Sequence, residues 1–343
     1  MSAVMSAVVF HGEGRWGMDQ VTVPTISRDD EVLLAVDRAG ICGTDLHILH
    51  IPSGHPATPG AILGHEYVAT LLDAGDGVRG FEKGDRVIVD PNLTCGLCPP
   101  CCAGRTNLCE RMTTLGIYLN GGLAAFNLAP VKALHKIRRE VPVEHAVLVE
   151  PLTCVLHSFE KAALQPGESV SIFGAGPIGL LFLLLFREAG AGSIFVAEPA
   201  SYRARKAREF GADEVIELTG EDAAEAICSV TNGGTDITID AVGRCMAMAL
   251  KVTRPGGRLI LFGMDQNSSV SVNQCDITKR ELTLHGSFIQ QTAFPKVVKL
   301  LESETLPIGQ LITHQLPLAE FAQALELLES GEAIKVVLDP SGA

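Results

Sequence analysis

Aromatic residues and clusters of basic residues are both scarce in this chain of 343 residues. Only 5% of the residues are aromatic although 47% are hydrophobic, so we expect cores built mainly from aliphatic side chains. Acidic residues outnumber Lys and Arg by 40 to 27, which gives a formal net charge of −13, and no run of basic residues interrupts this acidity. These properties argue against nucleic acid or an anionic membrane as a partner.

The sequence also shows no evident export or membrane signal. Its first residues, Met1–Met5, form neither a basic nor an apolar segment, so we expect no signal peptide and a cytoplasmic location. The stretch Ser169–Phe186 is long enough to raise the question of a membrane span, but glycines and a proline interrupt it, which favours a buried strand, turn and helix. In a reducing compartment we expect the ten cysteines to bind metal or to be buried rather than to form disulfides.

The length suggests about two domains, and the pattern changes near Val155. Residues 1–154 read as β-rich, whereas residues 155–288 alternate apolar runs with helical stretches, which predicts βαβ units and a parallel sheet. We expect residues 289–343 to return to the first domain, which would place the active site in a cleft between the domains. The expected strands are Val32–Val36, Tyr67–Leu72, Arg86–Val89, Val170–Phe173, Ser193–Ala197, Val215–Ile216, Ile237–Ala241, Arg258–Phe262, Thr283–Phe288 and Lys335–Leu338, and the expected helices are Ile178–Glu188, Tyr202–Phe210, Glu221–Val230, Pro295–Ser303 and Leu318–Ser330.

Four cysteines are grouped on one short segment. Cys95, Cys98, Cys101 and Cys109 are separated by two, two and seven residues. Zn²⁺ prefers four soft ligands in a tetrahedron, and short spacings let one loop wrap the ion. Cys102 adjoins Cys101, so we expect it to be a bystander. The compartment disfavours a disulfide cluster and the spacing disfavours an iron–sulfur cluster, so we predict a structural zinc in a lobe at about 92–112.

Two shorter motifs precede this lobe, and a third follows it. The segments 40–47 (GICGTDLH) and 64–66 (GHE) contain a Cys and a His that, taken alone, would more often be packing residues. Gly174, Gly176 and Gly179 form a GxGxxG motif between an apolar run and an apolar helix, where glycines permit a tight turn and close approach of a pyrophosphate. Glu198 follows the next expected strand, 24 residues after Gly174, where an acid can bind a ribose.

In this order the motifs resemble those of the zinc-dependent alcohol dehydrogenases of the medium-chain dehydrogenase/reductase family, and the resemblance covers nearly the whole chain. It is greatest to the sorbitol or polyol branch, because Glu150 begins a Glu-Pro-Leu run typical of that branch. The resemblance implies an α/β protein with a doubly wound Rossmann domain and a β-rich GroES-like catalytic domain. It also implies two zinc ions per chain, NAD as cofactor and a homo-oligomer, either a dimer or a tetramer.

The resemblance also implies a role for each catalytic residue. Cys42 and His65 would bind the catalytic zinc, with Glu66 bound directly or through water and Glu150 as a further ligand. Zinc lowers the pKa of a bound hydroxyl, so that the alcohol can lose its proton while a hydride passes to the nicotinamide. Thr44, the cofactor ribose and His47 would relay the proton to solvent. Asp45 is either a partner of a ligand or a turn residue, and Cys154 is expected to be a buried thiol.

Further cofactor contacts follow from the resemblance in the same way. Glu198 would accept hydrogen bonds from the adenosine ribose and would repel the phosphate of NADP, although Arg203 and Arg205 follow it and arginine often binds phosphate. Asp240, at a strand end, is as readily structural as functional. The other expected contacts are Ile178, Arg203, Phe262, Gly263, Met264, Ser287, Phe288 and Ile289.

We therefore expect an NAD-dependent zinc enzyme that oxidises a secondary alcohol, in particular a sugar alcohol or other polyol. Sorbitol dehydrogenases usually carry Tyr at the position of Ile48 and an Arg-Tyr pair at Ile289-Gln290, so a vicinal diol or a simple secondary alcohol remains an alternative substrate. A zinc-free reductase of the same family would lack the zinc ligands that this chain has. A non-catalytic NAD-binding protein would be expected to lose the ligands or the relay first.

Overall fold

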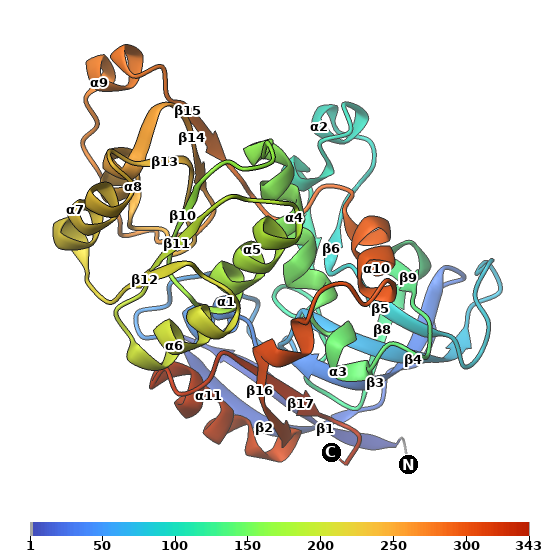
Figure 1. Cartoon of the computed structure of the whole chain (residues 1–343). Helices are drawn as coiled ribbons and strands as arrows, with labels where there is room; N and C mark the ends of the chain where they lie inside the picture. The colour runs from blue at the N-terminus through green and yellow to red at the C-terminus, as the bar shows by residue number, and fades with distance from the viewer. Residues whose placement is uncertain (1–2, 343) are drawn as a thin grey trace. The chain divides into compact units, whose positions relative to one another are not determined.

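The computed structural model describes residues 3–342. Met1, Ser2 and Ala343 lie outside it, and two of these residues belong to the segment Met1–Met5, which we expect not to be a signal peptide. The chain forms two compact units: residues 1–151 together with 291–343, and residues 152–290 (Figure 1). The expected boundaries, after residues 154 and 288, lie three and two residues from these. The first observed boundary falls inside one helix, α4 (Val149–Ala162), so no loop marks it in the sequence.

Unit 2, residues 152–290, is built on six parallel strands in the order β12-β11-β10-β13-β14-β15. The chain starts in the middle of this sheet at β10 (Val170–Phe173), extends to one edge and then returns to build the other half, as in doubly wound folds. All four residues of β10 are buried, as expected for a parallel strand covered on both faces. The apolar stretch Ser169–Phe186 is thus divided between β10 and α5 (Pro177–Glu188), as predicted. No helix within residues 3–342 has both the length and the apolar character needed to cross a membrane.

Helices connect the strands of unit 2 (Figure 1), and side chains from both helices and strands form its core. Ile227 of α7 and Leu250 of α8 pack with Phe173 of β10 and Leu259 of β14 in one cluster of buried apolar side chains. The other elements of the unit are β11 (Ile194–Ala197), α6 (Ser201–Glu209), β12 (Glu214–Ile216), α7 (Gly220–Val230), β13 (Thr235–Asp240), α8 (Met246–Val252), β14 (Thr253–Leu261), α9 (Gln274–Lys279) and β15 (Thr283–Gly286).

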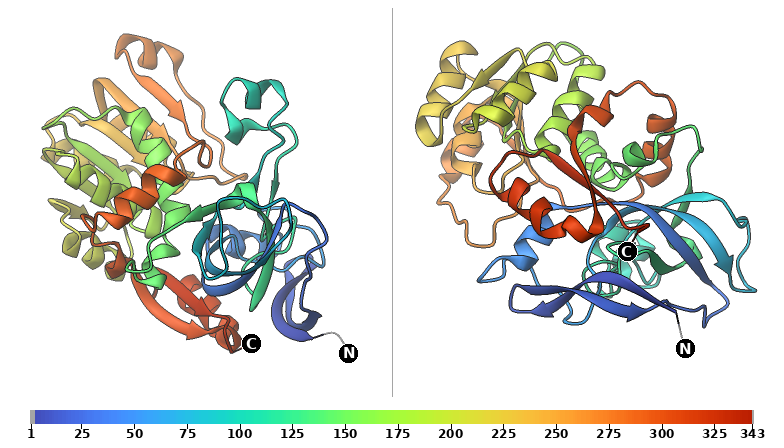
Figure 2. Two further views of the ribbon diagram at one scale, coloured as in Figure 1. Left: turned by 90° about the vertical axis from the view of Figure 1, so that its right-hand side faces the viewer. Right: turned by 90° about the horizontal axis from the view of Figure 1, so that it is seen from below.

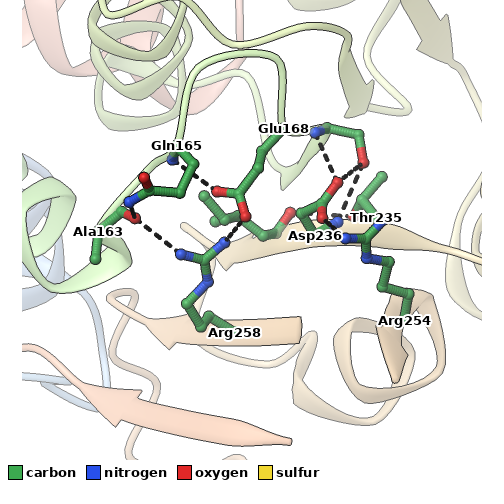
Figure 3. Close-up of polar contacts among 9 residues, drawn as sticks. Ala163, Gln165, Glu168, Thr235, Asp236, Arg254 and Arg258 are labelled. Atoms are coloured by element: carbon green, nitrogen blue, oxygen red, sulfur yellow. Dashed lines mark hydrogen bonds and ion pairs between the residues drawn. The ribbon is translucent and has the colours of Figure 1, made fainter. Parts of the chain in front are cut away.

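A polar network joins the segment before β10 to residues of β13 and β14 (Figure 3). The buried carboxylate of Asp236 accepts hydrogen bonds from the backbone N–H and the hydroxyl of Ser169, at 2.9 and 2.6 Å, and forms an ion pair with Arg254. Beside this group, Arg258 forms an ion pair with Glu168. The backbone N–H of Ser169 thereby has a side-chain partner.

Unit 1 contains a seven-stranded sheet with the path β16-β17-β3-β4-β5-β9, and β8 also pairs with β3. In β3 (Glu31–Gly40), Val32, Leu34 and Val36 are buried and alternate with half-buried residues, so one face of the strand lines the core. The remaining strands and hairpins of the unit are β1 (Val4–Gly12), β2 (Arg15–Thr22), β4 (Glu66–Ala74), β5 (Arg86–Val89), β6 (Asn92–Leu93), β7 (Thr113–Thr114), β8 (Phe126–Pro130), β9 (Leu134–Lys136), β16 (Ile312–Pro317) and β17 (Lys335–Asp339).

Short helices in unit 1 carry or support the predicted site. Helix α1 (Gly43–Leu49) follows β3, and the cysteine-rich segment around α2 (Pro99–Cys102, teal) projects from the sheet of the same unit (Figure 2). The other helices are η1 (Thr106–Leu108), η2 (Val131–Ala133), α3 (Val143–Ala146), α10 (Phe294–Glu302), η3 (Ile308–Leu311), η4 (Leu318–Glu320) and α11 (Phe321–Glu329).

Candidate functional site

The four grouped cysteines converge on one point. The Sγ atoms of Cys95, Cys98, Cys101 and Cys109 all lie within 4.8 Å of one another. The Cys95–Cys109 and Cys98–Cys109 sulfur distances are 3.5 and 3.9 Å. Four sulfurs at about 2.3 Å from a tetrahedral zinc ion would lie roughly 3.8 Å apart, whereas a disulfide would bring two of them to about 2 Å. The donor set and its spacing therefore fit one zinc ion.

Backbone groups of the lobe prepare these thiols for a cation. The N–H groups of Leu97 and Cys98 donate to the Cys95 sulfur and lower the pKa of that thiol to about 6. Burial raises the pKa of Cys101 to about 12, an effect that a bound cation would reverse. Cys102 lies outside the cluster, is exposed and has its Sγ 3.5 Å from the Leu97 carbonyl oxygen.

A second group of possible metal ligands forms where β3 and β4 meet α1. Cys42 is the residue before α1, His65 is the residue before β4, and Glu66 is the first residue of β4. One ligand atom from each of the three lies within 4.8 Å of the others, and His65 and Glu66 are buried. A thiol, an imidazole and a carboxylate are the ligand types of a catalytic zinc site, and three protein ligands leave a position for water or substrate.

Glu150 lies near this group, although its carboxylate is not among the mutually close ligand atoms. It is the second residue of α4 and is buried, and that burial raises the pKa of its carboxyl to about 7. The charges of His65 and Lys335 act in the opposite direction, and that of Glu66 adds to the rise. Of the two expected carboxylate ligands, the structure thus brings Glu66 into the cluster and places Glu150 beside it.

Asp45 closes a turn and also lies beside an expected ligand, so its position fits both of the roles that the sequence left open. Its Oδ2 accepts a hydrogen bond of 2.9 Å from the backbone N–H of Cys42, which closes the turn into α1. Its Oδ1 lies 3.7 Å from Nδ1 of His65, and both atoms are buried without a hydrogen-bond partner among residues 3–342. A carboxylate behind one ring nitrogen of a histidine orients the ring so that the other nitrogen can bind metal. Burial raises the pKa of Asp45. Burial alone would lower the pKa of His65, but the charges of Cys42 and Asp45 outweigh this effect and raise it.

Lys335 is a functional-site residue that the sequence did not indicate. It is the first residue of β17, its side chain is only 2% exposed, and its ammonium group forms an ion pair with Oε2 of Glu66. Burial disfavours the ammonium charge, but Glu66 and Cys42 outweigh burial and raise the pKa of Lys335. No motif marks this lysine, because its partner lies 269 residues away in the sequence.

The expected proton relay lies on the helix that follows Cys42. Thr44 and His47 are both residues of α1, and Oγ1 of Thr44 lies 3.7 Å from Sγ of Cys42. His47 is exposed, and its carbonyl oxygen accepts a hydrogen bond of 2.8 Å from the N–H of Gly54. Of the two expected relay residues, Thr44 thus lies next to Cys42 and His47 is exposed to solvent.

The glycine motif of unit 2 forms the turn from β10 into α5. Gly174 has a φ of 95°, and a Cβ on Gly179 would lie 1.9 Å from the carbonyl oxygen of Gly174. Only glycine fits this contact, which brings the first turn of α5 against the end of β10. The N–H groups at the start of α5 can then bind a phosphate.

Glu198 lies at the end of β11 and binds this turn. Its Oε2 accepts a hydrogen bond of 2.7 Å from the N–H of Ala175, and its Oε1 accepts one of 2.9 Å from the N–H of Ala200. The side chain thus links the glycine turn to the start of α6, a role beyond the ribose contact that the sequence predicted. Asp240 is structural, since its carboxylate accepts from the N–H groups of Val242, Gly243 and Cys245.

The other expected cofactor residues are spread over the same unit. Arg203 lies on α6, and its buried Nε atom has no hydrogen-bond partner within residues 3–342. Ser287 accepts a hydrogen bond of 2.6 Å from Ser158, and Ile289 has a positive φ of 38°, which is rare for a β-branched residue and marks local strain. Ile178 is on α5, Phe262, Gly263 and Met264 follow β14, and Phe288 follows β15.

Comparison with known proteins agrees with this arrangement. A model of the alcohol dehydrogenase GroES-like domain matches residues 28–139, and a model of zinc-binding dehydrogenases matches residues 177–303. Sorbitol dehydrogenase of Bacillus subtilis (strain 168) is 32% identical over 98% of this chain and 98% of its own.

Two solved structures are similar over nearly their whole length. A zinc-binding dehydrogenase from Sinorhizobium meliloti 1021 bound to NADP has a TM-score of 0.93 and 32% identity, covering 99% of this chain and 100% of that one. A structure from E. coli CFT073, described as a short chain alcohol dehydrogenase complexed with NADH, has a TM-score of 0.90 and 30% identity, covering 98% and 100%.

The chain therefore belongs to the zinc-dependent alcohol dehydrogenases of the medium-chain dehydrogenase/reductase family. Its two units are the GroES-like and Rossmann-type domains of that family, as the sequence predicted. The protein is an oxidoreductase that acts on CH–OH groups and uses zinc and a nicotinamide cofactor.

Proposed function

We propose that this enzyme oxidises a secondary alcohol, in particular a sugar alcohol or other polyol, with NAD as the hydride acceptor. The observation that carries the proposal is the cluster of Cys42, His65 and Glu66, whose ligand atoms lie within 4.8 Å of one another. The similarity to a sorbitol dehydrogenase over the full length supports the polyol substrate. Two zinc ions per chain would fill the two ligand groups.

Each residue of the site has a role in this reaction. Cys42, His65 and Glu66 would hold the catalytic zinc, with Glu150 as a further ligand or as the partner of a bound water. When bound, zinc supplies the Lewis acidity that lowers the pKa of a hydroxyl group. Thr44 would take up the proton of the substrate hydroxyl while giving up its own toward the cofactor ribose, and His47 would release a proton to solvent. Asp45 keeps His65 oriented toward the metal.

The preference for NAD rests on Glu198. Its carboxylate lies at the glycine turn, where two backbone N–H groups hold it in place. A phosphate on the adenosine ribose would bring a second negative charge against it, and like charges in a partly desolvated site repel strongly. One similar structure is bound to NADP and another to NADH, so similarity does not decide between the two cofactors. The proposal therefore depends on Glu198.

This chain differs from sorbitol dehydrogenases at two positions where they usually carry polyol-binding side chains. Ile48, where they usually carry Tyr, is fully buried in the core of unit 1 and offers no hydroxyl. Gln290, in place of the second residue of their Arg-Tyr pair, is 5% exposed. A vicinal diol or simple secondary alcohol is therefore the second candidate substrate. From the family we also infer a cytoplasmic homo-oligomer, whose size sedimentation would measure.

Metal analysis combined with an alcohol panel tests the function. Protein prepared without chelator should contain two zinc ions per chain and should reduce NAD with polyols better than with simple secondary alcohols. Cys42→Ala should lose one zinc and all turnover while the fold remains, and Cys154→Ala, a buried thiol outside both ligand groups, should keep both metals and activity. A chain that binds NAD but oxidises no alcohol would instead be the non-catalytic alternative.

A further inference from the structure

A buried lysine supports the candidate zinc site from the far end of the sequence. Nζ of Lys335 forms an ion pair with Oε2 of Glu66 and donates a hydrogen bond of 3.0 Å to the carbonyl oxygen of Ile41, the residue before Cys42. One ammonium group therefore contacts the side chain of one candidate ligand and the backbone next to another. Its side chain is 2% exposed and that of Glu66 is 1% exposed, so water does not screen the pair.

The strand order brings this pair together across a glycine. In the sheet, β3 lies between β4 and β17, and Gly40 is paired with Glu66 on one side and with Val337 on the other. A Cβ on Gly40 would lie 2.6 Å from Oε2 of Glu66 and 2.9 Å from Cε of Lys335. The missing side chain at Gly40 thus leaves the space in which the carboxylate and the ammonium meet.

Stability alone does not explain such a pair. Burying two charges is costly, and apolar residues of similar volume often stabilise a core as well as a buried ion pair does. An apolar side chain also lines this space, since a Cβ on Gly40 would lie 2.8 Å from Cγ1 of Val147. The ion pair instead places a cation on one particular oxygen of a ligand carboxylate. It leaves Oε1 as the oxygen that the ammonium does not hold.

We propose that Lys335 is the positioning residue of Glu66, and that by holding Oε2 it restricts Glu66 to one oxygen on the catalytic zinc. The proposal rests on the proposed function, because it assumes a zinc ion at Cys42, His65 and Glu66. A carboxylate can bind a metal through one oxygen or through both. With one oxygen held, a coordination position stays open for the substrate hydroxyl, as a catalytic zinc site requires.

The test compares Lys335→Met with Lys335→Arg, which keeps the cation. In Lys335→Met both oxygens of Glu66 become free for the metal, so substrate must displace one of them. We expect KM for the alcohol to rise on the order of 10- to 100-fold, the range to which one charge-assisted hydrogen bond corresponds. KM for NAD should stay unchanged. Lys335→Arg should restore most of the affinity for the alcohol.

Two metal measurements provide readouts other than turnover. The visible absorption of Co²⁺ depends on its coordination number, so the cobalt-substituted Lys335→Met protein should show a spectrum of higher coordination without substrate. Its metal should also be lost to a chelator more slowly than from the wild type, because Glu66 then holds it with two oxygens and a nearby positive charge is gone. A lysine that only stabilised the fold would have the opposite effect and would loosen the metal.

The control is Lys136→Met, which removes another lysine of unit 1 that is paired with a carboxylate, Asp85, at 2.6 Å. It should change none of these readouts. If Lys335→Met does not fold, Gly40→Ala keeps both charges but separates them and should give the same cobalt spectrum. A wild-type cobalt spectrum and unchanged KM in the folded variant overturn the proposal alone. A wild-type protein without metal at Cys42 overturns the proposed function and this proposal with it.

Discussion

Replacing Cys98 by alanine removes one of the four sulfur ligands from the lobe around α2. The buried cluster of this lobe consists of Cys95, Cys98, Cys101 and Cys109 with Met112, so it has almost no apolar core apart from the ligands themselves. The main core of unit 1 is a separate cluster. The variant should therefore open the lobe and leave the remainder of the unit folded.

The magnitude of the effect follows from what else holds the lobe in place. Hydrogen bonds of 2.8 Å join Thr106 Oγ1 to the Gln291 carbonyl oxygen and Lys132 Nζ to the Thr94 carbonyl oxygen. Each contributes about 1 kcal/mol, whereas structural zinc contributes on the order of 10 kcal/mol in zinc-finger peptides. Hydrogen bonds of this size cannot replace the metal once a ligand is lost.

Hydrogen exchange together with zinc content measures this prediction. The Cys98→Ala protein should contain one zinc ion fewer per chain and should lose exchange protection over residues 92–112. Cys102→Ala is the matched control, since its thiol is exposed and lies outside the cluster, and it should keep the metal and the protection. A Cys98→Ala protein with full metal content, or with a protected lobe after the metal is lost, would refute the reasoning.

Three further changes test the relay, the cofactor choice and the fold. His47→Ala should slow turnover by about 10²-fold and move the pH optimum upward, because hydroxide must replace the imidazole. An unchanged pH–rate profile would show that His47 has no role in proton transfer. Glu198→Gln should raise the ratio of kcat/KM for NADP to that for NAD by about tenfold or more, since like charges roughly 4 Å apart repel by about 1–4 kcal/mol. The ratio cancels any general loosening of the glycine turn, and equal wild-type efficiency with both cofactors would contradict the assignment. Asp236→Ala should lower the free energy of unfolding in urea by about 2–4 kcal/mol, because it leaves buried donors without an acceptor. Arg254→Ala should lower it by less than about 1 kcal/mol, because the side chain of Arg254 is 54% exposed. Equal losses would show that the ion pair, rather than the hydrogen bonds, holds the network of Figure 3.

The alternation of apolar runs with helical stretches predicted the parallel sheet of unit 2 with good boundaries. Val170–Phe173 matches β10, and Ile178–Glu188 differs from α5 by one residue. Prediction was poorer where the pattern was weak. The sequence indicated neither the β1–β2 hairpin nor β16. The residues of β2 and β16 are half-buried or exposed, and in β1 the consecutive buried residues Ala7–Phe10 interrupt any alternation.

The local motifs could be read from the sequence because their geometry depends on a few neighbouring residues. Short spacings predicted the group of Cys95–Cys109, and the tight contact between Gly174 and Gly179 lies within one turn. The cysteine group and the expected phosphate-binding turn are of this kind, since one loop builds the first and one strand–turn–helix unit builds the second.

Other features were decided only by the tertiary structure. Lys335 reaches Glu66 because β17 pairs with β3 and because Gly40 leaves a gap between them, and no local pattern carries that information. Asp45 faces His65 only after β4 and α1 are brought together. Glu198 was expected from its position after a strand, but its bonds to two backbone N–H groups depend on how the glycine turn packs against α6. Sequence determines which ligands and charges are available, whereas strand pairing decides which of them share one buried, poorly screened space.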